Sequence, residues 1–360
     1  MAVCIVAEAE FRKSTWCADI IRGITESAKK SRLSVMTEDI FSPEAKSVPK
    51  KDDLIAVIAH NPYKTEQLVM QSRSLSDAYI VVAGAECTDH GVSSVYTDTA
   101  NSVKSVLEYL SKDCGKTSPA LYGGNPSLAA DLKKLAAFPE KSRVYYSRDN
   151  LSECFRSFRG DLEKYDSVIC TNDYSAISLV NSLAECGVSK EDFPFIVSLA
   201  NTKLCECASP SVTSVTNSEY LLGEAVVSIY TMLLRENGAE SLSVCVKSGI
   251  MPRETTKFIP FTRRTSHAPS GQKQIPTLFY NDLAVESLIK IEKLLSGGNS
   301  EDVAVISMLA EGKSYEEIAE VASLSVSGVK YRVKQYVEKC GLSSGKELRA
   351  LSRKVFFGGR

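Results

Sequence analysis

The chain has 360 residues, which is too long for one ordinary core and predicts two or three domains. Its composition, 44% hydrophobic and 24% charged, is typical of a soluble globular protein and excludes a disordered or fibrous one. No apolar run approaches the roughly 20 residues that span a bilayer, and the first residues lack the basic segment of a signal peptide. We therefore expect a cytoplasmic protein with no membrane association.

Cysteine and histidine are placed unfavourably for a metal site. The eleven cysteines are scattered without a C-x-x-C pair, and only three histidines are present. Cys205 and Cys207 are separated by one residue, which is too few for a zinc knuckle. We expect reduced thiols that act as small apolar side chains, with no metal and no cofactor.

From the N-terminus to about Thr256, short apolar runs alternate with helical patterns. Val3–Ala9 reads as a strand, and Trp16–Lys30 and Asn101–Lys112 read as amphipathic helices. Further strand candidates are the runs LIAVIAH, YIVVAG, ALYGG, SVICTND and FIVSLA. Near-continuous apolar strands separated by helices are typical of parallel sheets covered on both faces. The pattern predicts an α/β fold of two doubly wound lobes within residues 1–256.

The amino-acid composition changes after Thr256. Residues 257–280 are rich in Pro, Ser, Thr and basic residues without a period, which predicts a linker. Residues 281–298 then predict a connecting helix with Leu283, Leu288, Ile291 and Leu295 along one side. This apolar side, or a lobe edge, is a candidate dimer interface.

Residues 299–360 predict a small all-helical domain. Ser300 is the expected N-cap of its first helix, and Ser314 with Glu317 forms a capping box for a short second helix. A tight turn through Leu324 leads to Ser325, the expected cap of the third helix. A short helix, a turn and a basic amphipathic helix together predict a helix-turn-helix.

The third helix separates into two faces. Its inward positions are Val326, Val329, Val333, Val337 and Cys340. The opposite side carries Ser327, Lys330, Tyr331 and Lys334. Such a face is either a solvated charged surface or one that enters the major groove of double-stranded DNA; the capping box, the short turn and the two-faced helix favour DNA.

Residues 301–348 also resemble the LuxR/NarL-type helix-turn-helix domain, through the L-A-x-G turn, the E-I-A helix, the S-x-x-T-V-K-like start of the third helix and the K-x-G-x-S-S ending. Gly328 replaces that family's usual Thr, and Gly345 its frequent Arg. The resemblance implies DNA-binding roles for two groups of residues. Lys330, Tyr331 and Lys334 would meet base edges, and Ser327, Lys339, Ser344 and Lys346 would hold phosphates.

Three positions have residue types suited to a ligand between the lobes. Trp16 follows a polar loop and could stack on a flat ligand, or belong to the core. Asp173 is the expected N-cap of the helix after SVIC, which would leave the Asn172 amide free for the cleft. Asn217 precedes another helix. Asn172 and Asn217 are alternatively plain turn or capping residues.

The same part of the chain resembles the lactose-repressor-type effector domain, related to type 1 periplasmic binding proteins. The resemblance is carried by STWCADIIRGI, DSVICTNDYSAISLVNSLAECGV and ASPSVTSVTNSEYLLGEAVV. It implies lobe 1 at about 1–116 and 218–240, and lobe 2 at about 117–217 and 241–256. It also implies an effector site lined by Trp16, Asp98, Asn172 and Asn217.

Two departures bear on the effector. Lys134 stands where this family has Arg, and Ala200 where its sugar-binding members have Asp. An Arg–carboxylate pair grips vicinal hydroxyls, whereas a point-charge Lys and a methyl group cannot. An ordinary sugar is therefore not the expected effector, and Lys134 could meet an anionic group.

These features predict a homodimeric transcription regulator in which a small-molecule effector controls DNA binding. One alternative is a DNA-binding regulator whose lobes have lost their ligand, so that it is constitutive or gated by a protein partner. A second is an enzyme built on the lobes, but G-x-S-x-G, P-loop and G-x-G-x-x-G motifs are missing from the sequence. We therefore expect no catalytic residues.

Overall fold

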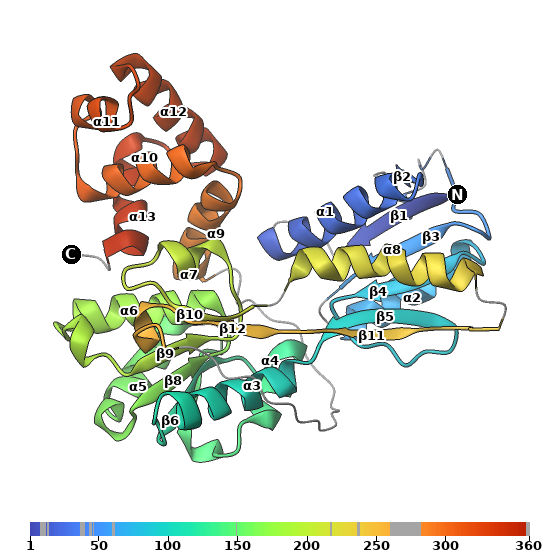
Figure 1. Ribbon diagram of the computed structural model, residues 1–360, viewed down its shortest axis with the longest axis horizontal. Coiled ribbons are helices and arrows are strands. Elements are labelled where there is room, and N and C mark those ends of the chain that lie inside the picture. Colours follow the sequence, from blue (N-terminus) through green and yellow to red (C-terminus); the bar gives the residue numbers. More distant parts are fainter. Residues whose placement is uncertain are drawn as a thin grey trace.

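Two α/β lobes and a helical C-terminal domain make up the protein (Figure 1). The computed structural model describes residues 1–7, 12, 14–36, 40–42, 45, 47–59, 62–148, 150–216, 218–235, 238–259 and 282–357. The predicted linker, 257–280, lies mostly outside the described residues.

Lobe 1 is built on a six-stranded parallel sheet. Its strands, in spatial order, are β11 (Ser243–Val246), β5 (Val92–Thr97), β4 (Tyr79–Ala83), β3 (Leu54–Ile58), β1 (Ala2–Ala7) and β2 (Ser34–Met36). Helices α1 (Thr15–Lys30) and α8 (Glu219–Arg235) pack on one face, and α2 (Pro62–Leu75) lies on the other. Burial on both faces accounts for the continuous apolar runs in these strands.

Lobe 2 repeats this design with one antiparallel edge. Its strands are β12 (Gly249–Met251), β10 (Thr213–Thr216), β9 (Phe195–Ser198), β8 (Ser167–Cys170), β6 (Pro119–Gly124) and β7 (Val144–Tyr146), with β12 antiparallel to β10. One face carries α3 (Thr99–Glu108) and α4 (Ala129–Ala137). The other carries α5 (Leu151–Arg159), α6 (Asp173–Glu185) and α7 (Lys203–Cys207). The predicted fold class of two parallel-sheet lobes is confirmed.

The predicted lobe boundaries need two corrections. Residues 99–113, expected in lobe 1, form α3 and a following turn whose Val103, Val106 and Tyr109 lie in the lobe 2 core. Residues 243–246, expected in lobe 2, form β11, which pairs with β5 of lobe 1. The chain thus passes between the lobes three times, as the resemblance implied, but the first and third crossings lie near residues 98 and 248; the second, between β10 and α8, is where it was expected.

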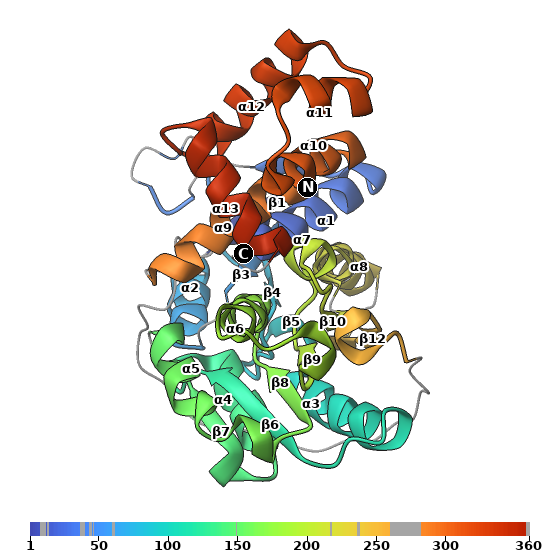
Figure 2. The same ribbon diagram turned by 90° about the vertical axis from the view of Figure 1, so that its left-hand side faces the viewer.

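The C-terminal domain is fused to lobe 2 by a shared core. Its helices are α9 (Leu283–Ser296), α10 (Ser300–Glu311), α11 (Tyr315–Val321), α12 (Val326–Lys339) and α13 (Gly345–Phe357). Ile291 of α9 and Phe356 of α13 belong to the same apolar cluster as Ile177 of α6 and Leu204 of α7. Figures 1 and 2 both place α9 and α13 against the lobes, and α11 and α12 at the far end.

This packing changes the expected use of α9. Of the predicted apolar side, Leu288, Ile291 and Leu295 are buried within the chain, and the side chain of Leu283 lies outside the part that the structure describes. The three buried residues contact lobe 2 and the C-terminal helices. The apolar side of α9 is therefore covered in this structure and is not a free dimerisation surface.

Six of the eleven cysteines are buried like small apolar side chains, as the sequence predicts, whereas Cys186 and Cys245 are exposed. All eleven are free thiols, and burial raises the pKa of Cys17 and Cys154 to about 11. A raised pKa disfavours the reactive thiolate. None of the described helices is long and apolar enough to cross a membrane.

Candidate functional site

A cleft of about 1000 Å³ opens between the two lobes, and a third wall comes from the C-terminal part of the chain. Lobe 1 contributes the start of α1 and the start of α8. Lobe 2 contributes the ends of β8 and β9 with the loops that follow them. The third wall is the end of α9, with Glu292, Lys293, Ser296 and Gly297. The carboxyl ends of parallel strands thus meet the cleft, as expected for an open α/β fold.

Trp16 lies at the lobe 1 wall, as predicted. Ser14 caps α1 by accepting a hydrogen bond from the Cys17 amide at 3.2 Å, which fixes the first turn at the cleft. The Trp16 ring lies against Gly84, where a Cβ atom would come within 2.7 Å of it. Trp16 is partly exposed and lines the cleft, so it is available for stacking.

The capping role predicted for Asp173 belongs to its neighbour Asn172. Asn172 is the N-cap of α6, because its Oδ1 accepts from the Ser175 amide at 2.9 Å. Asp173 is buried and accepts from the Thr202 amide at 2.6 Å and from the Ser198 hydroxyl. The amide oxygen of Asn172 is therefore committed to the helix, and its Nδ2 donates to Thr171 Oγ1 at 3.4 Å, although the residue does line the cleft. Asp173 fastens the loop after β9.

Lys134 lines the cleft but is not a free cation. It is 8% exposed and donates to Asp131 Oδ1 at 3.0 Å and to the Thr171 carbonyl at 2.7 Å. Its charge is therefore balanced inside lobe 2, and the anionic effector group considered for it has no support here.

The structure places only some of the other predicted residues in the cleft. Asp98 caps α3 by accepting from the Asn101 amide at 2.9 Å, and it is not among the residues that line the cleft. Its neighbours Thr97 and Thr99 do line the cleft. Asn217 lies outside the described residues. Ala200 lines the cleft, as the sequence comparison of this loop implied.

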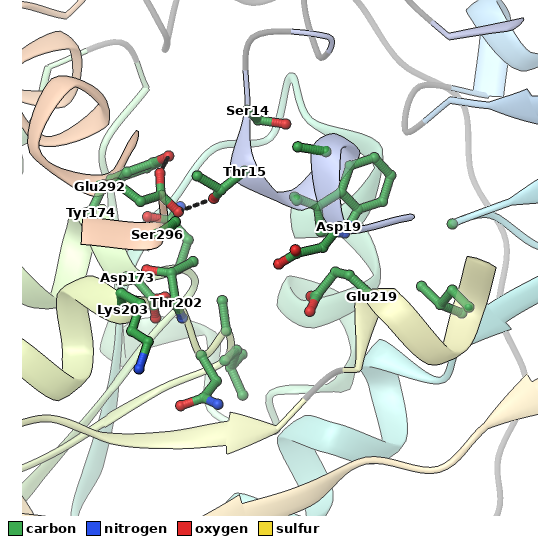
Figure 3. A pocket seen from close by; sticks show the side chains of 18 of the residues that line it. Ser14, Thr15, Asp19, Asp173, Tyr174, Thr202, Lys203, Glu219, Glu292 and Ser296 are labelled. Carbon is green, nitrogen blue, oxygen red and sulfur yellow. Dashed lines mark hydrogen bonds between the residues drawn. The ribbon is translucent and has the colours of Figure 1, made fainter. Parts of the chain in front are cut away.

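Glu292 of α9 reaches both lobes, a contact that the sequence did not indicate. The side chain is 1% exposed. It accepts a hydrogen bond from Tyr174 of lobe 2 at 2.6 Å and another from Thr15 of lobe 1 (Figure 3). Burial, with a smaller contribution from the Asp173 carboxylate, raises the pKa of Glu292 to about 7. One carboxyl thus ties the two lobes to the C-terminal domain.

Glu219 and Asp19 were also missed by sequence reasoning. Both carboxylates point into the cleft from the lobe 1 wall (Figure 3). Burial, with smaller contributions from Asp173, Asp19 and Glu292, raises the pKa of Glu219 to about 8. Asp19 could have been found, because it is three residues after Trp16 and so shares its helix face. Glu219 carried no comparable signal.

Arg253 is a cationic group that the sequence analysis overlooked. Its Nη2 donates to Asn201 Oδ1 at 2.7 Å, and its Nη1 donates to the Val212 carbonyl at 2.8 Å and Ser214 Oγ at 3.0 Å. These oxygens are uncharged. Asn201 follows Ala200, so the loop after β9 offers an amide, not a carboxylate, to the guanidinium.

A second candidate surface lies on α11 and α12. The capping box of Ser314 and Glu317 is present, and Ser325 caps α12 by accepting from the Gly328 amide at 3.0 Å. Only residues 322–325 separate the two helices. The first helix of this domain departs from prediction, because Asn299 and not Ser300 is its N-cap, in a box with Asp302.

The predicted outward face of α12 is exposed. Of its inward positions, Val329, Val333 and Cys340 are buried, and Val326 and Val337 are partly buried. Every residue assigned to DNA is exposed, namely Ser327, Lys330, Tyr331, Lys334, Lys339, Ser344 and Lys346.

Arg332, the remaining basic residue of α12, has a structural role. It pairs with Glu301 at 2.8 Å and Asp302 at 3.0 Å. These two contacts hold α12 against the start of α10. The uncompensated positive charge of α12 is therefore concentrated on its lysines.

Among the described residues, no group of His, Cys, Asp and Glu side chains is arranged to hold a metal ion.

Curated proteins resemble about half of this chain in sequence. Catabolite control protein A of Staphylococcus xylosus is 27% identical over 193 residues, covering 51% of this chain and 58% of that protein. Its Staphylococcus aureus (strain MRSA252) counterpart is 27% identical over 195 residues, with the same coverage. The chain therefore spans a little more than half the length of these curated relatives. No family model matches the sequence.

Solved structures of the same fold are more distant in sequence. The transcriptional regulator CelR–cellobiose complex has a TM-score of 0.56 at 15% identity, covering 71% of this chain and 84% of that chain. Transcription regulator CcpA of Lactococcus lactis has a TM-score of 0.53 at 19% identity, covering 71% and 100%. A LacI family transcriptional regulator from Mycobacterium smegmatis has a TM-score of 0.54 at 14% identity, covering 71% and 98%.

These likenesses define the two lobes as the fold of a lactose-repressor-type effector domain. The three solved structures are named as transcription regulators, and none of the proteins above is named as an enzyme.

Proposed function

We propose that the protein is a cytoplasmic, sequence-specific DNA-binding transcription regulator. In this proposal the two lobes bind a small-molecule effector, and residues 299–360 form a LuxR/NarL-type DNA-binding domain. The observation that carries the proposal is the exposed face of α12, where Lys330, Tyr331 and Lys334 follow a short turn from α11. A helix of this kind fits the major groove, which is about 12 Å wide.

The charge distribution supports DNA over a merely solvated face. The chain as a whole has a formal net charge of -1, yet the outward face of α12 carries Lys330 and Lys334, and the exposed Lys339 lies at the end of the same helix. Arg332 is neutralised by Glu301 and Asp302, whereas no described carboxylate lies within ion-pair distance of these three lysines. Exposed lysines left unpaired on a recognition helix suit a polyanionic partner.

Helix α9 supplies the proposed link between the effector and DNA. Its far end lines the cleft, and its buried side packs on lobe 2 and α13. An effector that favours one arrangement of the lobes would therefore also shift the position of the C-terminal domain. Such coupling can only be as large as the difference in effector affinity between the two arrangements, typically ~1–3 kcal/mol.

A homodimer is part of the proposal. One recognition helix reads few base pairs, and two helices on paired half-sites multiply specificity. Because the apolar side of α9 is covered within the chain, the dimer interface is assigned to another surface, such as a lobe edge.

The test is DNA binding by the full-length protein. A duplex is selected from a random-sequence pool, and its affinity is measured at several salt concentrations. Lys330→Ala combined with Lys334→Ala should weaken binding to the selected duplex and reduce its preference over an unselected duplex of the same length, since each good base-edge contact is worth about 1–3 kcal/mol of discrimination. The matched control, Lys29→Ala with Lys51→Ala, removes two exposed lobe 1 lysines and should leave both quantities unchanged.

Failure of the wild type to enrich any sequence would refute the function. Equal loss of binding in both double variants would instead refute the assignment of α12 as the reading helix.

A further inference from the structure

Gln335 lies beside Tyr331 on the outward side of α12. The two residues are four positions apart, so they are neighbours on the helix surface, and Gln335 Nε2 donates a hydrogen bond to Tyr331 Oη at 3.2 Å. Tyr331 is exposed and Gln335 is partly exposed. Gln335 belongs to neither group of residues assigned to DNA above, although it shares their helix face.

This hydrogen bond fixes the orientation of the Gln335 amide. One of the two Nε2 hydrogens is committed to Tyr331, so the amide cannot turn over without losing the contact. In the part of the chain that the structure describes, Gln335 Oε1 accepts no hydrogen bond and the second Nε2 hydrogen has no acceptor. The side chain therefore presents one donor beside one acceptor.

A donor beside an acceptor matches the edge of adenine in the major groove. Adenine presents its N7 acceptor next to its N6 donors, which is the pattern that a glutamine amide complements with two hydrogen bonds. Guanine presents two acceptors there, and cytosine presents a donor at N4. An amide held in one orientation satisfies both of its groups on adenine and only one of them on guanine or cytosine.

The helix surface next to this pair is open. Gly328 lies three residues before Tyr331 and seven before Gln335, so the three positions form one row along α12. A Cβ atom at Gly328 would meet only Ser325 Oγ, at 3.1 Å, apart from the neighbouring backbone. The missing side chain therefore leaves room for a base edge to come close to the helix at the start of this row.

We propose that Gln335 is a specificity-determining residue that reads an adenine in the major groove, and that Tyr331 positions its amide. Nε2 would donate to adenine N7, and Oε1 would accept from N6. The proposal deepens the DNA-binding function proposed above and rests on it. Tyr331 acts here by holding Gln335, in addition to the base contact implied for it by resemblance.

The first experiment compares base preferences. The full-length wild type, Gln335→Ala and Gln335→Glu each select duplexes from the same random-sequence pool. The wild type should select adenine at one position of the site where Gln335→Ala has no preference. Gln335→Glu should select cytosine at that position, because a carboxylate only accepts hydrogen bonds and cytosine N4 donates one. The matched control, Gln71→Glu, makes the same change at an exposed position of α2 and should keep the wild-type sequence.

The second experiment tests the two atoms of the base. The adenine at that position is replaced by 7-deazaadenine, which lacks the N7 acceptor, or by purine, which lacks the N6 amino group. Each replacement should raise the wild-type Kd about fivefold or more and leave the Kd of Gln335→Ala unchanged. Tyr331→Phe should reduce the preference for adenine over the other three bases, whereas a merely structural role of Tyr331 would weaken binding to all four equally.

The outcomes separate this inference from the proposed function. It is overturned if Gln335→Glu selects the same bases as the wild type, or if the wild type binds both base analogues as tightly as adenine. The analogue measurement uses the wild type and so decides the matter whatever the affinity of the variants. Either negative result, in a wild type that selects a sequence, leaves the proposed function intact. A wild type that enriches no sequence removes both.

Discussion

Single side chains at the cleft act through partners that are distant in sequence. Glu292 meets Thr15 and Tyr174, which are 277 and 118 residues away along the chain. Lys134 meets the Thr171 carbonyl across 37 residues. Residue types at the ends of strands could be predicted, and Trp16 and Asn172 do line the cleft. Their hydrogen-bond partners could not, because those depend on how the lobes and α9 pack.

Lys134 should prove to be a structural residue. Lys134→Met removes the partner of Asp131, which is 2% exposed, and leaves a carboxylate buried without its cation. Breaking such a pair typically costs about 3–5 kcal/mol of unfolding free energy. Urea denaturation measures the loss. Lys133→Met, at the half-exposed neighbour paired with Glu86 at 3.7 Å, should change stability by no more than about 0.5 kcal/mol. Equal effects of the two changes would contradict this role.

Glu292 should give the folded state a distinctive pH dependence. Its folded pKa, about 7, lies above the ordinary value near 4.3, so the folded chain holds this proton more tightly than the unfolded chain. Its stabilisation is complete below pH ~4.3 and is lost as the pH rises to about 7, at up to ~1.4 kcal/mol per pH unit. Glu219, with a folded pKa of about 8, extends the same trend upward.

The Glu292→Gln variant isolates this contribution. Its unfolding free energy should fall less steeply than that of the wild type between pH 5 and pH 7.5, as measured by urea denaturation at several pH values. Glu206→Gln, which changes a half-exposed carboxylate, should follow the wild type. Parallel curves for Glu292→Gln and the wild type would show that this carboxyl is not buried as described.

Among the helices and strands, the strongest sequence signals were the continuous apolar runs and the caps. They located β1, β3, β4, β6, β8 and β9, and they predicted the Ser314 and Ser325 caps correctly. The edge strands β2, β7 and β11 are short or less buried and were missed. The caps of α6 and α10 were each assigned one residue too late, because Asn172–Asp173 and Asn299–Ser300 both place two capping types side by side.

Helices α1 and α8 should depend on two glycines for their close approach. A Cβ at Gly223 would lie 2.2 Å from the Ile20 carbonyl oxygen, and one at Gly23 would lie 2.2 Å from the Tyr220 carbonyl oxygen. Because backbone atoms cannot give way, Gly223→Ala should lower the unfolding free energy by about 1–3 kcal/mol or more. Gly160→Ala, where nothing lies within 4 Å, is the control for an added methyl group. Equal stability of both variants would contradict the packing of α1 on α8.

Across the whole molecule, sequence patterns predicted three modules but not their assembly. The lobes, α9 and the terminal helical domain were each anticipated. The shared core of α9, α13 and lobe 2 was not, because an apolar helix side predicts burial without naming the surface that buries it. For the same reason, the sequence did not indicate that the end of α9 forms the third wall of the cleft. The proposed regulation depends on this packing, because α9 and α13 join the domain that carries α12 to the lobe that forms part of the cleft (Figure 2).

Removing the hydroxyls that fasten α9 in the cleft should therefore alter DNA binding from a distance. Thr15→Val with Tyr174→Phe leaves Glu292 buried without these donors and touches no residue of α10 to α13. The orientation of the two reading helices in a dimer would then be less well held. The Kd for the selected duplex, measured by fluorescence anisotropy, should rise at least about fivefold, the low end of ordinary coupling between sites. An unchanged Kd in a double variant that remains folded would mean that the cleft and the DNA-binding helix are not coupled through α9.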